Sequence, residues 1–260
     1  IYVGRPVVMA AEQPVRRMGP GGSPSGAEKQ VMSDPATYQK LAVFVPETAT
    51  DSSAIILNVN NGGWFASELK TGIEEGGSYT SDSDTDKVGA ALAAGYVYVD
   101  VGTRGRGVVA ADGSLPGKAP AAVVDTKAAI RFLRLNDPVL PGSSDKIVIT
   151  GTSGGGGLSA VVAASGNSAD YLPYLAEIGA AGITDTASSH LNDDVFAVIA
   201  YCPITDLGNA DLAYEWLYQD VRREQNTANN DYTALARSAS AKLAAAYPVY
   251  LEGLGLTLPD

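Results

Sequence analysis

A run of glycines between a strand pattern and a helix pattern constrains this fold more than any other feature of the sequence. Residues 146–150 form a short β-prone segment, which is followed directly by Gly151-Thr152-Ser153-Gly154-Gly155-Gly156-Gly157. The apolar segment 158–164 comes next and is typical of a buried helix. Glycines here let strand and helix approach closely, and a sharp turn lifts the side chain of Ser153 above the sheet edge. The run therefore predicts a strand–turn–helix unit with one hydroxyl at its apex.

Strand and helix patterns alternate along most of the remaining chain. Strands are expected at residues 41–45, 54–59, 96–101, 146–150 and 195–201. Helices are expected at residues 86–94, 120–135, 158–164, 211–223 and 231–246. Strands separated by helices of this length form parallel βαβ units. We therefore predict an α/β fold, a mostly parallel sheet with helices on both faces.

The segment 120–135 has the clearest helical periodicity. Four apolar residues share one face of this predicted helix, and two arginines lie off it: Val124, Ala128, Phe132 and Leu135, then Arg131 and Arg134. Upstream, the acidic triplet at 82, 84 and 86 does not fit a calcium loop, because Lys87 and Ala93 stand where Gly and Glu are needed. A polar loop that caps the next helix is the better interpretation.

The motif Gly151-Thr152-Ser153-Gly154-Gly155 has the pattern Gly-x-Ser-x-Gly after a strand and before a helix. This is the nucleophile elbow of α/β-hydrolases. A phosphate loop of the Walker type needs Lys followed by Ser or Thr, and Gly157-Leu158 stand there instead. A dinucleotide fingerprint starting at Gly154 fits poorly and lacks its acidic partner. A glycine-rich packing turn remains the structural alternative.

A serine nucleophile needs two N–H donors for the oxyanion that forms during acyl transfer. In this fold one donor is the N–H of the residue after the serine, here Gly154, and the other lies in the loop after the third strand. Segment 54–59 leads into Asn60-Asn61-Gly62-Gly63-Trp64, two βα units before the elbow. We predict Gly63 as the second donor, with Gly62 as the next choice; a plain turn is the alternative.

The chain contains no obvious base for this serine. The elbow strand is normally the fifth of eight, and the acid and histidine follow the last two, which this sequence does not reach. His190 is the only histidine, and it lies in the polar loop 184–194 before residues 195–201, which we expect to form the sixth strand of this fold. That is the opposite end of a parallel sheet, so we expect a solvent-facing residue. Asp206 follows the sixth strand on the side of Ser153 and is a candidate triad acid or pocket residue.

Charge and composition exclude other classes of protein. Asp plus Glu number 29 and Lys plus Arg 18, a net charge of −11, which argues against nucleic acid as a partner. The longest nearly apolar stretch, residues 90–99, is about half of what crosses a bilayer, so we expect no membrane partner. One cysteine, Cys202, excludes an internal disulfide and a cysteine-based metal cluster. Residue 1 is Ile, so a leader removed upstream is compatible with the sequence, as is secretion or a place in the cell envelope.

Longer motifs resemble a known family, the bacterial tannases and their feruloyl-esterase-like relatives. The similarity extends over most of the chain and is best from about 96 to 220. Its motifs are Thr103-Arg104-Gly105-Arg106-Gly107, Gly117-Lys118-Ala119-Pro120, residues 124–134, Asn167-Ser168-Ala169-Asp170-Tyr171, Tyr201-Cys202-Pro203-Ile204-Thr205-Asp206-Leu207, Asn209-Ala210-Asp211 and Tyr214-Glu215-Trp216. The sequence does not resemble the fungal tannases, in which a cysteine stands beside the serine.

The resemblance implies an α/β-hydrolase that cleaves galloyl or related phenolic esters. It implies Ser153 as nucleophile, Gly63 and Gly154 as oxyanion donors, and Ile204 packed against the aromatic acyl ring. It also implies a helical lid inserted after the sixth strand, so we expect a hydrolase core over residues 1–207 and the start of the lid over 208–260. Trp64 departs from the family pattern, and we expect it to reshape the acyl pocket.

Three functions follow from these observations. The leading one is a serine carboxylesterase for aromatic esters that works through an acyl-enzyme, without a metal or organic cofactor. The second is a general small-acyl esterase on the same scaffold, and the third is a binding module that has lost its base. Because the last strands, the acid and the histidine are missing, we expect them in a C-terminal fragment or second chain that pairs with residues 195–201.

Overall fold

The computed structural model describes residues 1–14, 29–70, 78–80, 86–185, 188–203, 206–226 and 234–257. The chain forms two compact units, Ile1–Pro203 and Ile204–Asp260. The division lies four residues before the expected boundary between positions 207 and 208. Each unit is described by itself.

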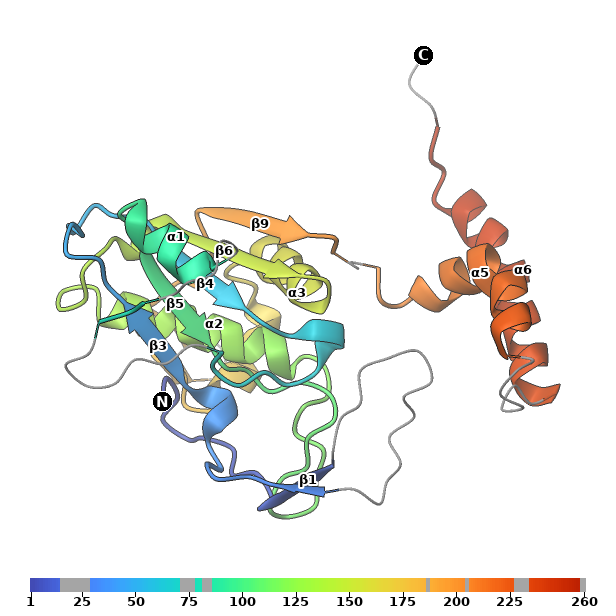
Figure 1. Cartoon of the computed structure of the whole chain (residues 1–260), viewed down its shortest axis with the longest axis horizontal. Helices are drawn as coiled ribbons and strands as arrows, with labels where there is room; N and C mark the ends of the chain where they lie inside the picture. Colours follow the sequence, from blue (N-terminus) through green and yellow to red (C-terminus); the bar gives the residue numbers. More distant parts are fainter. Residues whose placement is uncertain are drawn as a thin grey trace. The chain divides into compact units, whose positions relative to one another are not determined.

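The first unit is built around a five-stranded sheet in the order β3-β5-β4-β6-β9 (Figure 1). The first strand in this order, β3, pairs antiparallel with β5, and the other neighbours are parallel. The strands are β3 (Leu41–Phe44), β4 (Ile55–Val59), β5 (Val97–Val101), β6 (Ile147–Thr152) and β9 (Ala197–Tyr201). All five agree with the predicted segments within two residues, because each is a continuous β-prone run.

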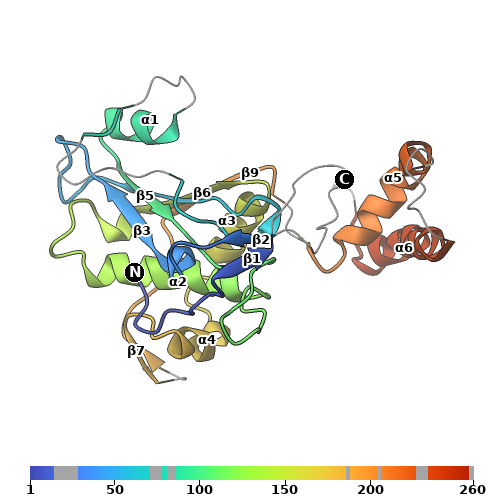
Figure 2. The same ribbon diagram turned by 60° about the horizontal axis from the view of Figure 1, so that its bottom comes forward.

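Alternate residues of the strands enter two separate cores. Leu57, Val99 and Ile149 belong to the larger core, which α2 (Ala121–Leu135) and α3 (Gly154–Ala164) cover. On the other face, Tyr98 and Phe44 pack with α1 (Lys87–Ala93). Figure 2 shows α1 and α2 on opposite sides of the sheet. Helices therefore cover both faces, as the sequence predicts.

Asp86 begins α1 as the predicted polar cap. Its carboxylate accepts hydrogen bonds from the backbone N–H groups of Val88 and Gly89, both at 3.0 Å. These N–H groups have no partner inside the helix, so the carboxylate satisfies them and favours a helix start at Lys87.

Several short elements have no clear sequence signal and were not predicted. They comprise β1 (Glu12–Pro14), β2 (Lys29–Val31), α4 (Leu172–Glu177), β7 (Ile183–Asp185), β8 (Ser188–Ser189) and the 3₁₀ turns η1 (Thr37–Gln39), η2 (Gly62–Trp64), η3 (Ser144–Lys146) and η4 (Ala169–Tyr171). All except α4 have three residues or fewer, which is shorter than a period-2 or period-3.6 pattern needs.

The second unit is a helix pair, α5 (Ala210–Asn226) and α6 (Ala234–Gly253). The Trp216 and Tyr247 rings lie 5.3 Å apart, and the Ser240 hydroxyl donates to the Glu215 carboxylate at 2.6 Å. Among the helices of the described residues, none has the length and apolar character needed to cross a membrane.

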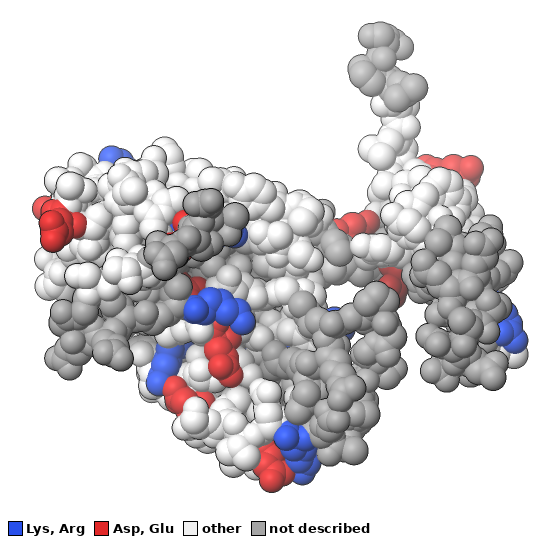
Figure 3. Space-filling view, in the orientation of Figure 1, with Lys and Arg blue, Asp and Glu red and all other residues white. Residues whose placement is uncertain are grey.

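On the face in Figure 3, acidic and basic side chains form small groups separated by wide uncharged areas.

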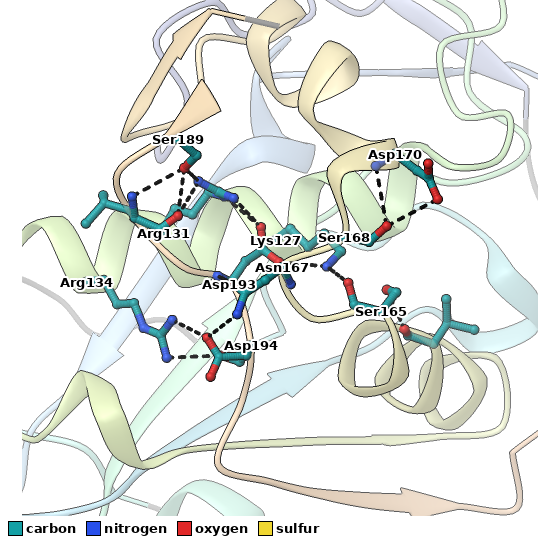
Figure 4. A network of polar contacts seen from close by, with 12 residues as sticks. Lys127, Arg131, Arg134, Ser165, Asn167, Ser168, Asp170, Ser189, Asp193 and Asp194 are labelled. Atoms are coloured by element: carbon teal, nitrogen blue, oxygen red, sulfur yellow. Dashed lines mark hydrogen bonds and ion pairs between the residues drawn. The ribbon is translucent and has the colours of Figure 1, made fainter. Parts of the chain in front are cut away.

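The prediction of an amphipathic α2 with both arginines off its buried face is wrong for Arg131. Leu135 is 55% exposed, whereas Arg131 is only 2% exposed. The reason is a partner that the helix periodicity does not reveal. Figure 4 shows Arg131 and Lys127 converging on Asp193, which lies on the segment before β9.

This cluster buries two cations around one carboxylate. Lys127 Nζ lies 2.8 Å from one Asp193 oxygen, and Arg131 Nε lies 2.8 Å from the other. Lys127 also donates to the Ser165 carbonyl at 2.6 Å, and Arg131 to the Leu191 carbonyl at 2.8 Å. Burial lowers the pKa of Lys127, while Asp193 opposes the shift. The carboxylate therefore neutralises much of a charge that would otherwise be buried unpaired.

Replacing this carboxylate should destabilise the protein strongly. In Asp193→Asn, two buried cations lose their counter-charge, so we expect the free energy of unfolding of the full-length protein to fall by about 3–5 kcal/mol. Urea denaturation measures the loss. The matched control is Asp194→Asn, since the Asp194 side chain is 49% exposed and pairs with Arg134. Arg134 is 11% exposed, but water screens the half-exposed Asp194 carboxylate, so Asp194→Asn should lose clearly less stability than Asp193→Asn, and equal losses in the two variants would contradict the expectation.

Candidate active site

Ser153 stands between the end of β6 and the start of α3. It is exposed, and its φ of 58° and ψ of −118° lie in a region that residues with a side chain rarely adopt. Two backbone hydrogen bonds hold this conformation: Ser153 N–H donates to the Tyr201 carbonyl at 3.0 Å, and Gly157 N–H donates to the Ser153 carbonyl at 2.9 Å. Such strain costs on the order of 1–3 kcal/mol and persists only where the surroundings enforce it.

The helix after Ser153 begins earlier than the sequence suggests. Glycine is a poor helix former, so the expected helix began at Leu158, yet α3 begins at Gly154. Close backbone approach explains the glycines. A Cβ on Gly156 would lie 2.4 Å from the Tyr201 carbonyl oxygen. A Cβ on Gly154 would lie 2.2 Å from the Asn61 carbonyl oxygen and 2.8 Å from the Gly63 nitrogen.

The start of α3 therefore touches the loop after β4, which carries the predicted oxyanion donors. In this loop Gly62 N–H donates to the Asn60 carbonyl at 2.8 Å, and Trp64 N–H donates to the Asn61 carbonyl at 2.9 Å. Within the described part of the chain, Gly63 N–H has no hydrogen-bond acceptor. This pattern favours Gly63 over Gly62 as a donor. Gly154 N–H is also available, since the first N–H groups of a helix have no partner within it.

Two asparagines position this loop from inside the protein. Asn61 is fully buried; its side-chain NH₂ donates to the Phe65 carbonyl at 2.8 Å, and its side-chain oxygen accepts from the Thr103 hydroxyl at 2.9 Å. The Asn60 side chain donates to Asp100 at 2.7 Å. No local sequence pattern indicates the contact between Asn61 and Thr103, because it joins residues 42 positions apart.

Trp64 follows Gly63 with a φ of 61°, so two successive residues are left-handed. Its side chain is half-buried and packs against the larger core. The indole N–H is buried and has no hydrogen-bond partner among the described residues. The bulk of this side chain is thus directed partly into the protein.

Three candidate residues remain, which are His190, Asp206 and Ile204. His190 is exposed and precedes β9, whereas Ser153 bonds to the residue that ends β9. Asp206 belongs to the second unit, where the Tyr250 hydroxyl and the Asn209 side chain donate to its carboxylate. The hydrogen bond from Tyr250 is the main cause of its lowered pKa. Ile204 falls outside the described residues.

The close approach at Gly154 should make this position intolerant of any side chain. In Gly154→Ala the new methyl group meets backbone atoms of Asn61, Gly63 and Trp64, so either the loop or the helix must shift. We expect the free energy of unfolding to fall by about 1–3 kcal/mol, measured by thermal denaturation. Gly208→Ala is the control, because a Cβ there meets nothing within 4 Å. Equal midpoints for the two variants would contradict the close approach.

Known proteins resemble this chain in both sequence and fold. The BD-FAE family profile matches residues 41–250. Fusobacterium nucleatum tannase, known from a crystal structure, is 38% identical in sequence, with a TM-score of 0.70. The match covers 85% of this chain and 50% of the tannase chain. The native structure of the tannin acyl hydrolase from Lactobacillus plantarum is 32% identical in sequence, with a TM-score of 0.68. The match covers 100% of this chain and 51% of that one.

A tannin acyl hydrolase in complex with ethyl gallate is 33% identical with a TM-score of 0.67, and the match covers 100% of this chain and 51% of that one. The chain thus spans about half the length of the solved structures it matches. Among curated proteins, no sequence matches. The family match covers most of the chain, and the mostly parallel sheet agrees with it. The chain belongs to the BD-FAE family of α/β-hydrolases, and it shares its fold with bacterial tannases.

Proposed function

We propose that this protein is part of a serine carboxylesterase that hydrolyses aromatic esters of the galloyl or hydroxycinnamoyl type. One observation carries the proposal. An exposed hydroxyl on a strained strand–helix turn lies next to a helix start that touches the Gly63 nitrogen. A hydroxyl beside two available N–H groups suits acyl transfer, in which negative charge develops on the carbonyl oxygen.

The chemistry assigns one role to each group. Ser153 Oγ attacks the ester carbonyl carbon, and the N–H groups of Gly63 and Gly154 bind the oxyanion of the tetrahedral intermediate. Collapse of this intermediate expels the alcohol and leaves an acyl-enzyme. Water then attacks the acyl carbon, and a second oxyanion forms at the same place before the acid is released.

A base must take the serine proton, and we propose that a histidine outside residues 1–260 does so, together with its acid partner. The placement of His190 before β9 supports this. The edge of the sheet supports it as well: Val198 and Ile199 on β9 are 41% and 44% exposed, and β9 pairs only with β6 among the described strands. An apolar edge strand of this kind suits pairing with a further strand.

The substrate class rests on the relatives and on the residues around the turn. Solved tannin acyl hydrolases bind ethyl gallate and 3,4-dihydroxybenzoate, both of which carry a hydroxylated aromatic acyl group. We propose that Gly62 and Trp64 contribute to the substrate pocket of this protein. Trp64 favours the second candidate, a general small-acyl esterase, because the part of its side chain outside the core narrows the space for an acyl ring.

Substitution of Ser153 tests the nucleophile and the strain at once. In the full-length protein, Ser153→Ala and Ser153→Gly should both lose turnover of methyl gallate by several orders of magnitude, since no hydroxyl remains. Glycine tolerates a positive φ, so Ser153→Gly should be more stable than Ser153→Ala by about 1 kcal/mol in urea denaturation. Ester hydrolysis that persists in both variants would rule out Ser153 as the nucleophile.

A substrate series separates the two esterase candidates. We expect kcat/KM for methyl gallate or methyl ferulate to exceed that for methyl butyrate by about tenfold or more, because an aromatic ring buries more apolar area in the acyl pocket. Ser153→Ala gives the background rate for each ester. A preference for methyl butyrate would instead identify a small-acyl esterase.

A further inference from the structure

Arg106 contacts the loop that carries the proposed oxyanion donor. Its Nε–H donates to the Gly63 carbonyl at 2.7 Å, and its guanidinium lies 4.0 Å from the centre of the Phe65 ring. The backbone of Arg106 joins the same loop, since its N–H donates to the Trp64 carbonyl at 3.0 Å. One residue on the segment after β5 therefore touches three consecutive residues of the loop.

These contacts act on an unusual stretch of backbone. Gly63 and Trp64 have φ values of 58° and 61°. A left-handed conformation is unfavourable for a tryptophan, and it persists only where neighbouring groups enforce it. Asn61 holds one side of the Gly63–Trp64 peptide by accepting the Trp64 N–H, and Arg106 holds the other side at the Gly63 carbonyl.

We propose that Arg106 is a positioning residue that keeps the Gly63 N–H directed toward the substrate carbonyl. Fixing both ends of the Gly63–Trp64 peptide restricts the rotation of Gly63. The preceding Gly62–Gly63 peptide, which carries the donor N–H, is held by the hydrogen bond from Phe65 N–H to the Gly62 carbonyl at 3.2 Å. The inference rests on the proposed function, because it assigns a role within the same oxyanion hole. Arg106 acts through Gly63 and does not itself donate to the oxyanion.

The side-chain chemistry of arginine suits this role. A guanidinium is planar, so it stacks on Phe65 while Nε–H points along its edge to the carbonyl. A lysine ammonium has no plane to stack and no fixed direction for its donors. Arg106→Lys therefore keeps the charge but loses the fixed geometry, whereas Arg106→Met keeps much of the length and loses both.

Arg5 provides a matched control for the substitutions of Arg106. This arginine is exposed as well, and it donates from Nε to a backbone carbonyl, that of Glu177, at 2.9 Å. Its contacts lie at the end of α4 and involve no residue of the loop or of the Ser153 turn. Arg5→Met removes a comparable contact at a place where catalysis should not change.

The test compares Arg106→Met, Arg106→Lys, Arg5→Met and Ser153→Ala in the full-length protein with methyl gallate. We expect Arg106→Met to lower kcat by about tenfold to a hundredfold while KM changes less than about twofold, since a small displacement of a catalytic group costs rates of that order. Arg106→Lys should recover little of the loss, and Arg5→Met should match the wild type. Inhibition by phenylboronic acid, which forms a tetrahedral adduct with a serine, should weaken in Arg106→Met as kcat falls.

Any other result would contradict either the positioning role of Arg106 or the proposed function. An unchanged kcat with a raised KM in Arg106→Met would show a substrate contact in place of a positioning role. The same loss in Arg5→Met would show general destabilisation, and full activity in Arg106→Lys would show that charge alone matters. If Ser153→Ala is inactive but Arg106→Met is normal, the positioning role fails alone; if Ser153→Ala is active, the proposed function fails with it.

Discussion

The contact between two backbones at the start of α3 is the constraint on which the candidate site depends. At Gly154 the helix lies so close to the loop after β4 that no side chain fits between them. This approach brings the turn at Ser153 and the loop at Gly63 together without a side-chain contact. Backbone groups vary little in position once their strands are paired, so the parallel pairing of β4 with β6 sets the geometry of the site.

Buried polar side chains hold the segments that surround this contact. Asn61 and Thr103 fix the loop after β4 to the segment after β5, and Asp125 does the same for α2 by accepting from Arg104 at 2.9 Å. Asp193 fixes the approach to β9 against Lys127 and Arg131. A buried group of this kind is costly unless every partner is in place, so these contacts specify one arrangement of the loops.

The proposed site lies in one of the two units, and the family match extends over both. Residues 1–203 contain the proposed nucleophile and oxyanion donors, whereas the two helices from 204 onward form a unit of their own. The solved tannases are about twice as long as this chain. The proposed mechanism still needs a base and an acid, whereas the proposed oxyanion donors lie in the described part of the first unit.

The sequence by itself determined the order of strands and helices, the cap at Asp86, and the candidate residues Ser153, Gly154 and Gly63. These features depend on neighbours in the chain: runs of apolar residues, glycines at a turn, and an aspartate before a helix. Only the tertiary structure decided that Arg131 is buried, that α3 begins at Gly154, and that Asn61, Thr103 and Arg106 meet one loop. The physical reason is that a partner distant in sequence, such as Asp193 for Arg131, leaves no periodic signal in the helix. Once the segments pack, the charge of Asp193 stabilises the buried Arg131 at a position where the helix pattern predicts an exposed residue.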